Sequence, residues 1–161
     1  MAFGTSSKIG MNPNATTTTA TFGIGDRALG TQDTMWVYVQ MNGAATTGMC
    51  CTINTGNTAT PAITSAAQAA ANSLIGFAQT AFADTEFGWL ALNGNNVYIR
   101  VSGTTSCSQV MYIATTSGCI HPTSASSTLA GVVLIANTSA TATNQAVLAN
   151  LSWPRFVNTG M

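Results

Sequence analysis

The alternation of apolar and polar residues along this chain predicts a series of short β-strands. The segment TMWVYVQM at residues 34–41 is rich in β-branched and aromatic residues, which favour strands. Its period of two places Val37 and Val39 on one face and Trp36 and Tyr38 on the other. Because both faces are apolar, we expect this strand to be covered on both sides.

Beyond residue 42 the chain shows further strand-like patterns of apolar and polar residues, interrupted by turn residues. Pro61 predicts an edge position for the strand that contains it, because proline cannot donate a hydrogen bond to a neighbouring strand. The Ala-rich residues 65–73 predict a loop with a short helix at most. Further strands are predicted at residues 49–54, 60–64, 97–103, 108–116, 129–139 and 146–153, with two more strand-like pieces within 73–92.

Residues Asn93–Asn96 predict a hairpin loop between two of these strands. They read Asn-Gly-Asn-Asn, and both residue types tolerate positive φ. In a hairpin of this register Trp89 lies opposite Arg100, which would bring a guanidinium close to an indole face.

The last two predicted strands differ in pattern. Residues 129–139 form an almost continuous apolar run, which predicts a central, buried strand. In residues 146–153 the alternation points Val147, Leu151 and Trp153 inward, and we expect Pro154 to end the strand.

Together these patterns predict an all-β fold, a small antiparallel β-barrel or β-sandwich, at residues 34–156. The 161 residues suffice for one domain. Residues 1–33 hold a Thr tract, five glycines and few apolar residues. We therefore expect an extended N-terminal arm that lies apart from packed elements, with terminal disorder as the alternative. Residues 157–161 form a C-terminal tail.

Charged residues are scarce. The chain has 4 Lys or Arg and 4 Asp or Glu, or 5% of its residues, against about 25% in typical domains. No charged residue occurs between Arg100 and Arg155. Such a chain suits a dense protein assembly, where long charged side chains would lose rotamer entropy; an ordinary neutral domain is the alternative. The four basic residues are dispersed, so we expect no nucleic-acid partner.

Residue types that perform catalysis elsewhere form no active-site pattern in this sequence. His121 is the single histidine and precedes Pro122 in a polar stretch, which is typical of a solvated residue. Asp84 and Glu86 could form a glycosidase pair or part of a weak calcium site, but nothing else in the sequence supports either. We therefore predict no enzymatic activity, no catalytic residue, no metal and no cofactor.

The cysteines also lack a metal or redox motif. Cys50, Cys51, Cys107 and Cys119 include no CxxC pair, and no signal peptide precedes them. We expect reduced, mostly buried thiols, while a disulfide involving Cys107 and Cys119 stays open. The sequence has no apolar run of 18 or more residues, so no membrane partner is expected.

Several segments in order resemble tailed-bacteriophage capsid decoration proteins, which are also called head-stabilisation or cement proteins. The segments are TMWVYVQM (34–41), SLIGFAQTAFADTEFGWLALNG (73–94), VYIRVSG (97–103), LAGVVLIA (129–136) and LSWPR (151–155). The resemblance implies a small β-rich protein on the outside of an expanded icosahedral shell, where it bridges neighbouring capsomers.

The resemblance also implies partners and a location. The partners would be the major capsid protein and further copies of the chain itself, as a homotrimer in preference to a homodimer. The chain would be made in the host bacterial cytoplasm and carried on the capsid exterior of the virion. Arg27, Trp36 and Arg155 are the candidate residues for capsid or subunit contact. The alternative function is a phage fibre or spike adhesin that binds surface carbohydrate, since exposed aromatic residues and neutral polar loops suit sugars.

Overall fold

The computed structural model describes residues 10–62, 74–107, 109–114, 116–122, 128–138 and 144–157. Within these ranges the chain forms strands and no helix, so none of them holds a helix that could span a membrane. The prediction of an all-β fold is confirmed. The predicted short helix at 65–73 and the tail after Val157 lie outside the described residues. The strands are β1 (Arg27–Leu29), β2 (Met35–Met41), β3 (Cys50–Ile53), β4 (Thr58–Pro61), β5 (Leu74–Ala78), β6 (Phe87–Val101), β7 (Met111–Ile113), β8 (Ile120–His121), β9 (Thr128–Leu134) and β10 (Gln145–Val157).

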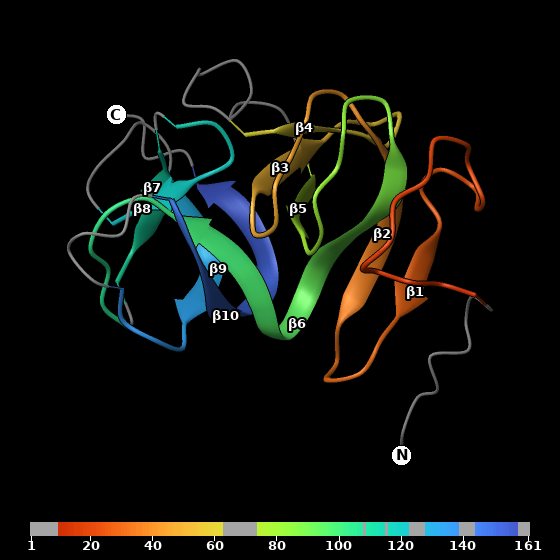
Figure 1. Cartoon of the computed structure of the whole chain (residues 1–161). Helices are drawn as coiled ribbons and strands as arrows, with labels where there is room; N and C mark the ends of the chain where they lie inside the picture. The colour runs from red at the N-terminus through yellow and green to blue at the C-terminus, as the bar shows by residue number, and fades with distance from the viewer. Residues whose placement is uncertain are drawn as a thin grey trace.

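Strand pairing closes two circuits that share β6. The first circuit runs β2–β4–β3–β5–β6 and returns to β2, and the second runs β6–β10–β9–β7–β8 and returns to β6. Figure 1 shows the two circuits as lobes on either side of β6. Two of the pairings, β2–β4 and β6–β8, are parallel, so the sheet is mixed rather than purely antiparallel as predicted. The arrangement is sandwich-like, with two packed halves instead of one barrel.

Two hydrophobic clusters fill these halves. The smaller one is lined by all five strands of the first circuit and includes Val39, Ile53 and Leu90. The larger one fills the second circuit and continues over the opposite face of the first, where it includes Tyr38 and Trp89. Strand β2 therefore contributes one face to each cluster, which confirms the prediction that it is covered on both sides.

The predicted hairpin at Asn93–Asn96 is wrong, because these residues lie inside one continuous strand. Strand β6 passes from the first circuit to the second through a bend at Gly94, whose φ is +131°. A Cβ atom at Gly94 would lie 2.6 Å from the Cα atom of Thr34, so only glycine allows this approach. The tolerance of Asn and Gly for positive φ suits a hairpin turn, but here it allows a strand to bend.

The expected contact between Trp89 and Arg100 disappears with the hairpin. Trp89 has Tyr38 as its cross-strand partner and Arg100 has Ala146, in opposite halves of the fold. The Arg100 guanidinium instead donates hydrogen bonds to backbone carbonyls, over 2.8 Å to Asn144 and 3.3 Å to Thr47.

Strand β10 also departs from its prediction. Its register against β9 shifts between Leu151 and Arg155, and Trp153 within this bulge has a φ of +47°. The extra residues break the alternation, so that Pro154 is buried, Trp153 is exposed and the strand continues to Val157. The expectations that Trp153 faces inward and that Pro154 ends the strand are therefore wrong.

Two further strand expectations need correction. Strand β4 lies between β2 and β3 and is not an edge, but its pairing with β2 covers only Thr58 and Ala59. Pro61 lies beyond that pairing, where no donor to β2 is required. Strand β9 is central, between β10 and β7, yet it is buried on one face only, since Val133 is exposed.

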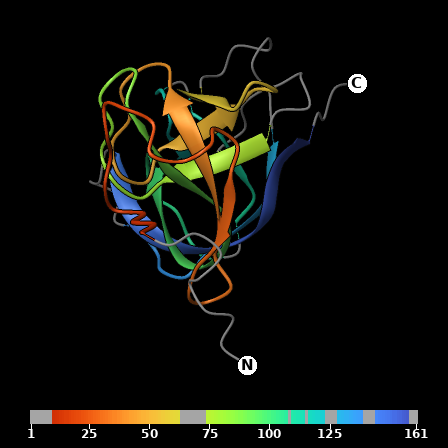
Figure 2. The same cartoon turned by 90° about the vertical axis from the view of Figure 1, so that its right-hand side faces the viewer.

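Residues 10–33 pack on the same chain. Strand β1 pairs with β2, and Thr17 forms an isolated β-bridge with Phe87. Figure 2 shows this segment crossing in front of β2. Before β1 it consists largely of turns and bends, and it does not lie apart from the packed elements as expected. The physical reason is the apolar side chains of Met11, Phe22 and Ala28, which reach the larger cluster from this segment.

Candidate binding surfaces

The N-terminal segment, residues 10–26, forms an aromatic cluster with β2 and β6. The ring of Phe22 meets Tyr38 and Trp89 edge to face, with centroid distances of 5.3 and 5.2 Å. Phe87 stacks on the other side of Tyr38 at 6.4 Å. Edge-to-face aromatic pairs contribute about 0.5–1.5 kcal/mol each beyond the area they bury, so Phe22 anchors the segment to the body of the protein.

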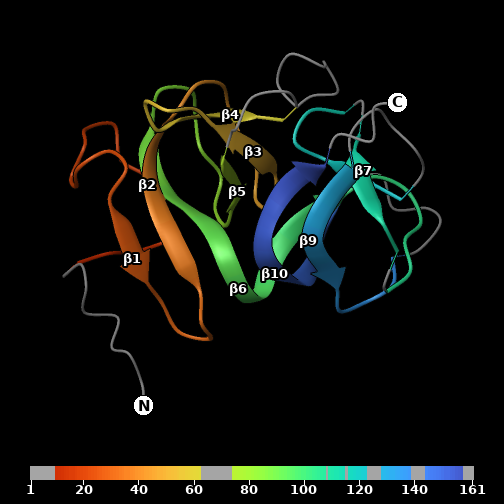
Figure 3. The ribbon, with the colours of Figure 1, turned by 180° about the vertical axis from the view of Figure 1, so that it is seen from behind.

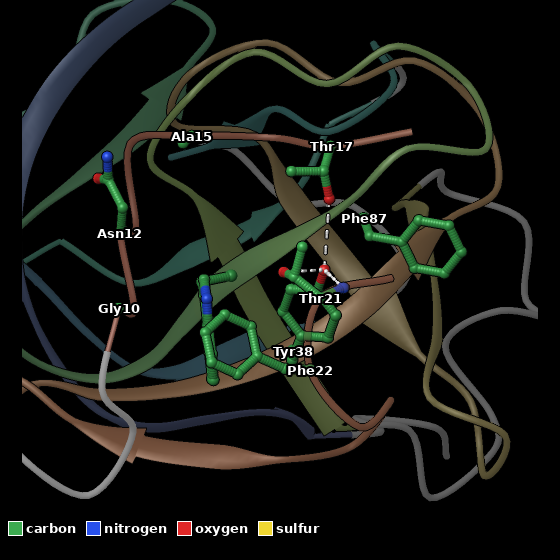
Figure 4. Close-up of a pocket in the computed structure, with 9 residues that line it drawn as sticks. Gly10, Asn12, Ala15, Thr17, Thr21, Phe22, Tyr38 and Phe87 are labelled. Carbon is green, nitrogen blue, oxygen red and sulfur yellow. Dashed lines mark hydrogen bonds between the residues drawn. The ribbon is translucent and has the colours of Figure 1, made fainter. Parts of the chain in front are cut away.

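The segment leaves a pocket of about 210 Å³ over this cluster, called the aromatic pocket below. Figure 4 shows its lining side chains, and none of them is charged. The lining residues are Gly10, Asn12, Ala15, Thr17, Thr21, Phe22, Tyr38, Phe87 and Trp89. Aromatic walls with a few hydroxyl groups suit an apolar side chain or a similarly small apolar group.

Hydrogen bonds fix the polar groups of the aromatic pocket. The Tyr38 hydroxyl accepts from the Thr21 amide at 3.1 Å and lies 3.1 and 3.4 Å from the hydroxyls of Thr21 and Thr17. Figure 4 shows both threonine side chains directed at Tyr38. Burial opposes ionisation of Tyr38, but hydrogen bonds from Thr17, Thr21 and the Phe22 backbone outweigh it and lower the pKa of the phenol. These groups are held by one another and leave the aromatic surfaces as the main contact area.

The three candidate contact residues lie in different environments. Arg27 is exposed on β1, and Arg155 is exposed on β10 beyond the bulge, where it pairs with Ala130 in the other half. Trp36 is buried, and its indole nitrogen donates to the Thr34 hydroxyl at 3.1 Å. Its indole lines a second cavity of about 130 Å³ together with Met11 and Pro13. Arg27 and Trp36 thus lie on neighbouring strands, and the structure does not bring Arg155 to them.

A second candidate surface is the outer sheet face, defined here by Tyr98, Val133, Ile135 and Leu148. Tyr98 pairs with Leu148, whose carbonyl accepts a hydrogen bond from the Ile135 amide. Tyr98, Val133 and Ile135 are exposed by 46%, 53% and 46%. Figure 3 shows β9 and β10 side by side with β6 behind them. This row of apolar side chains on three paired strands is typical of an interaction surface.

The acidic residues considered for chemistry have structural contacts. Asp84 accepts a hydrogen bond from the Gly43 amide at 2.6 Å, and Glu86 accepts one from the Ala83 amide at 2.8 Å. Both carboxylates therefore stabilise turns next to β6. Among the described residues, no three His, Cys, Asp or Glu side chains gather in a group that could hold a metal ion.

All four thiols are free, so Cys107 and Cys119 are not joined in this structure. Cys50, Cys51 and Cys119 are buried, and Cys107 is exposed. Burial raises the pKa of Cys51 to about 12 and raises those of Cys50 and Cys119 as well. These three thiols behave as small apolar core residues rather than as nucleophiles.

The aromatic pocket could not be found from the sequence. It joins residues of the N-terminal segment to β2 and to the start of β6, which are far apart along the chain. The one available signal was Phe22, a lone aromatic residue in a polar stretch. Comparison with protein-family models, curated proteins and solved structures finds no significant match to this chain.

Proposed function

We propose that this protein is a non-catalytic structural component of a bacteriophage virion that binds the outside of an icosahedral capsid and cements neighbouring capsomers. The observation that carries the proposal is the uncharged aromatic pocket of about 210 Å³. A pocket with aromatic walls can receive one apolar side chain of the major capsid protein, and such central anchors supply most of the energy of a protein interface.

Two further properties support this function. The near absence of charge allows many copies to lie close together without repulsion. The ordered segments that resemble capsid decoration proteins lie mostly on β2, β5, β6, β9 and β10. A protein that binds only the closed lattice stabilises it by mass action, and weak contacts repeated by symmetry add up.

We propose that the outer sheet face mediates association with further copies of the chain, as a homotrimer in preference to a homodimer. Its exposed side chains carry no charge, so identical copies can meet there without like-charge repulsion. The nearest cation along β6 is Arg100, whose guanidinium already bonds to backbone carbonyls. Closed symmetry would repeat the capsid contact in each subunit.

The test adds the purified protein to undecorated phage heads and measures the temperature at which they release DNA. Two matched variants locate the contact. Ala15 lines the aromatic pocket and Ala20 does not, although both are exposed on the N-terminal segment. Ala15→Leu should fill the pocket and weaken head binding at least tenfold, or about 1.4 kcal/mol, while Ala20→Leu should bind like the unmodified protein.

Two outcomes would contradict different parts of the proposal. An unchanged release temperature with bound protein would contradict cementing. Equal binding by Ala15→Leu and the unmodified protein would contradict docking at the aromatic pocket and direct attention to Arg27 or Arg155.

A further inference from the structure

Trp153 occupies a position where tryptophan is rarely found. It lies in the β10 bulge with a φ of +47°, a region that side chains with a Cβ atom seldom adopt. Its side chain is 45% exposed, whereas Trp36 and Trp89 are 8% and 1% exposed. Bulges of this kind redirect a side chain out of the strand alternation. The bulge here presents an indole to solvent that regular alternation would bury.

Amide side chains lie at this bulge and at the neighbouring bend of β6. The Trp153 amide donates to the side-chain oxygen of Asn93 at 3.3 Å. Asn96, three residues further along β6, donates its backbone amide to the Asn150 side chain at 3.3 Å. Its side-chain nitrogen donates to the Gln32 side chain at 3.2 Å. The bend of β6 thus collects neutral polar groups from three separate segments, and Asn93 joins them to the backbone of Trp153.

The hydrogen bonds above use one side-chain atom each of Asn96 and Asn150, which leaves the other polar atom of each amide for a ligand. Asn95, Asn96 and Asn150 are all exposed, and each amide both donates and accepts. Asp33 is exposed nearby, and its backbone carbonyl accepts from the Asn93 side chain at 3.4 Å. Gln32, Gly94 and Asn96 at this site all have positive φ.

We propose that Trp153 and the amides at the β6 bend form a binding site for a neutral saccharide. The apolar C–H face of a pyranose ring would stack on the indole, as an electron-rich aromatic face favours. The ring hydroxyls, which both donate and accept, match the amides of Asn96 and Asn150. A protein partner could also use an exposed tryptophan, and the measurements below distinguish it from a saccharide.

This inference does not rest on capsid binding. The aromatic pocket lies at the start of β6, near Phe87, and the saccharide site lies at its bend near Asn93. It gives the carbohydrate-binding alternative from the sequence a specific location. A virion surface protein could hold the capsid by one site and a host glycan by the other, and each site can be lost without the other.

The test measures binding of the purified full chain to neutral oligosaccharides of glucose, galactose, mannose and N-acetylglucosamine by titration calorimetry. Oligosaccharides that contain uronic or sialic acid form a parallel set. At least one neutral ligand should bind. Trp153→Ala should weaken that binding at least tenfold, and Trp153→Phe should retain part of it. Ile24→Ala removes an apolar side chain of equal exposure (45%) elsewhere and should bind normally.

A second measurement uses the unmodified protein, so it does not depend on the folding of a variant. N-bromosuccinimide oxidises exposed indoles, and the bound neutral saccharide should protect Trp153 from it. No binding to any neutral ligand, binding only to acidic ligands, or no protection of Trp153 would overturn the proposal. Loss of self-association in Trp153→Ala would also overturn it, since Trp153 would then be a subunit contact.

Discussion

The two halves of β6 show how one strand can lie in two environments. From Phe87 to Leu92 almost every residue is buried, so both faces of the strand are covered. From Val97 to Val101 burial alternates, with Tyr98 exposed between buried neighbours. The first half has the smaller cluster on one side and the N-terminal segment on the other. The described residues place no corresponding cover over Tyr98.

This difference teaches that the N-terminal segment acts as a cover for the first circuit. Without it, Tyr38 and Trp89 would face solvent as Tyr98 does. The cover depends on few groups, chiefly the Phe22 ring, the bridge of Thr17 to Phe87 and the pairing of β1 with β2.

Deletion of residues 1–30 should uncover the first half of β6 and destabilise the fold. It removes β1 and Phe22 and exposes Trp36, Tyr38 and Trp89, so we expect a loss of about 4 kcal/mol or more in the free energy of unfolding. Urea denaturation followed by circular dichroism measures it. Deletion of residues 1–9 alone is the control. A truncated protein with unchanged stability would show that the segment is dispensable.

Gly94→Ala should uncouple the two halves at the bend. The new Cβ atom would lie 2.6 Å from the Cα atom of Thr34 at a φ of +131°, so we expect a loss of about 3 kcal/mol. Gly56→Ala is the matched control, because Gly56 is exposed in a turn with no closer contact than 3.4 Å. Equal thermal unfolding of both variants would contradict the strict need for glycine at the bend.

Alkaline pH should lower the free energy of unfolding, because the buried thiols ionise more readily in the unfolded chain. The pKa of Cys51 is about 12 in the folded protein, compared with 9.0 as its ordinary value. The unfolded chain therefore loses this proton first, and the free energy of unfolding falls as pH rises above 9. We expect Cys51 to account for a loss of about 1.4 kcal/mol by pH 10. Urea titrations between pH 7 and 10.5 measure the decline, and Cys51→Ala should make it shallower. A flat profile would contradict this account.

Tyr98→Thr should have the smallest effect on stability, within about 0.5 kcal/mol, because the side chain is exposed in the isolated chain. The substitution should instead weaken association between copies of the chain. If the outer sheet face joins subunits, sedimentation velocity will show a shift towards monomer, whereas Val110→Thr, at an exposed position outside this face, will not. An unaltered oligomer in Tyr98→Thr would exclude the outer sheet face as the subunit contact.

Local patterns predicted most strands but not how they connect. The alternation at 34–41 and 97–101 predicts these strands correctly, because burial on a strand follows a period of two. The hairpin prediction at Asn93–Asn96 is wrong because a hairpin and a bend need the same backbone freedom. Only the contact with Thr34 distinguishes them. The prediction that Trp153 faces inward is wrong because a bulge shifts the alternation of β10. The proposed sites depend on residues that meet only through these two irregularities or through the N-terminal segment, so no local pattern contained them.

The sharing of β6 also has a consequence for the order of folding. All strands of the first circuit precede the bend, so a chain emerging from the ribosome can complete that circuit before β7 to β10 exist. The second half of β6 then extends from a folded first circuit, which already fixes the direction of the strand. Strand β10, the last made, has most of its pairing partners there and on β9. We expect the first half to act as a template, so that the second half begins its assembly from an existing edge.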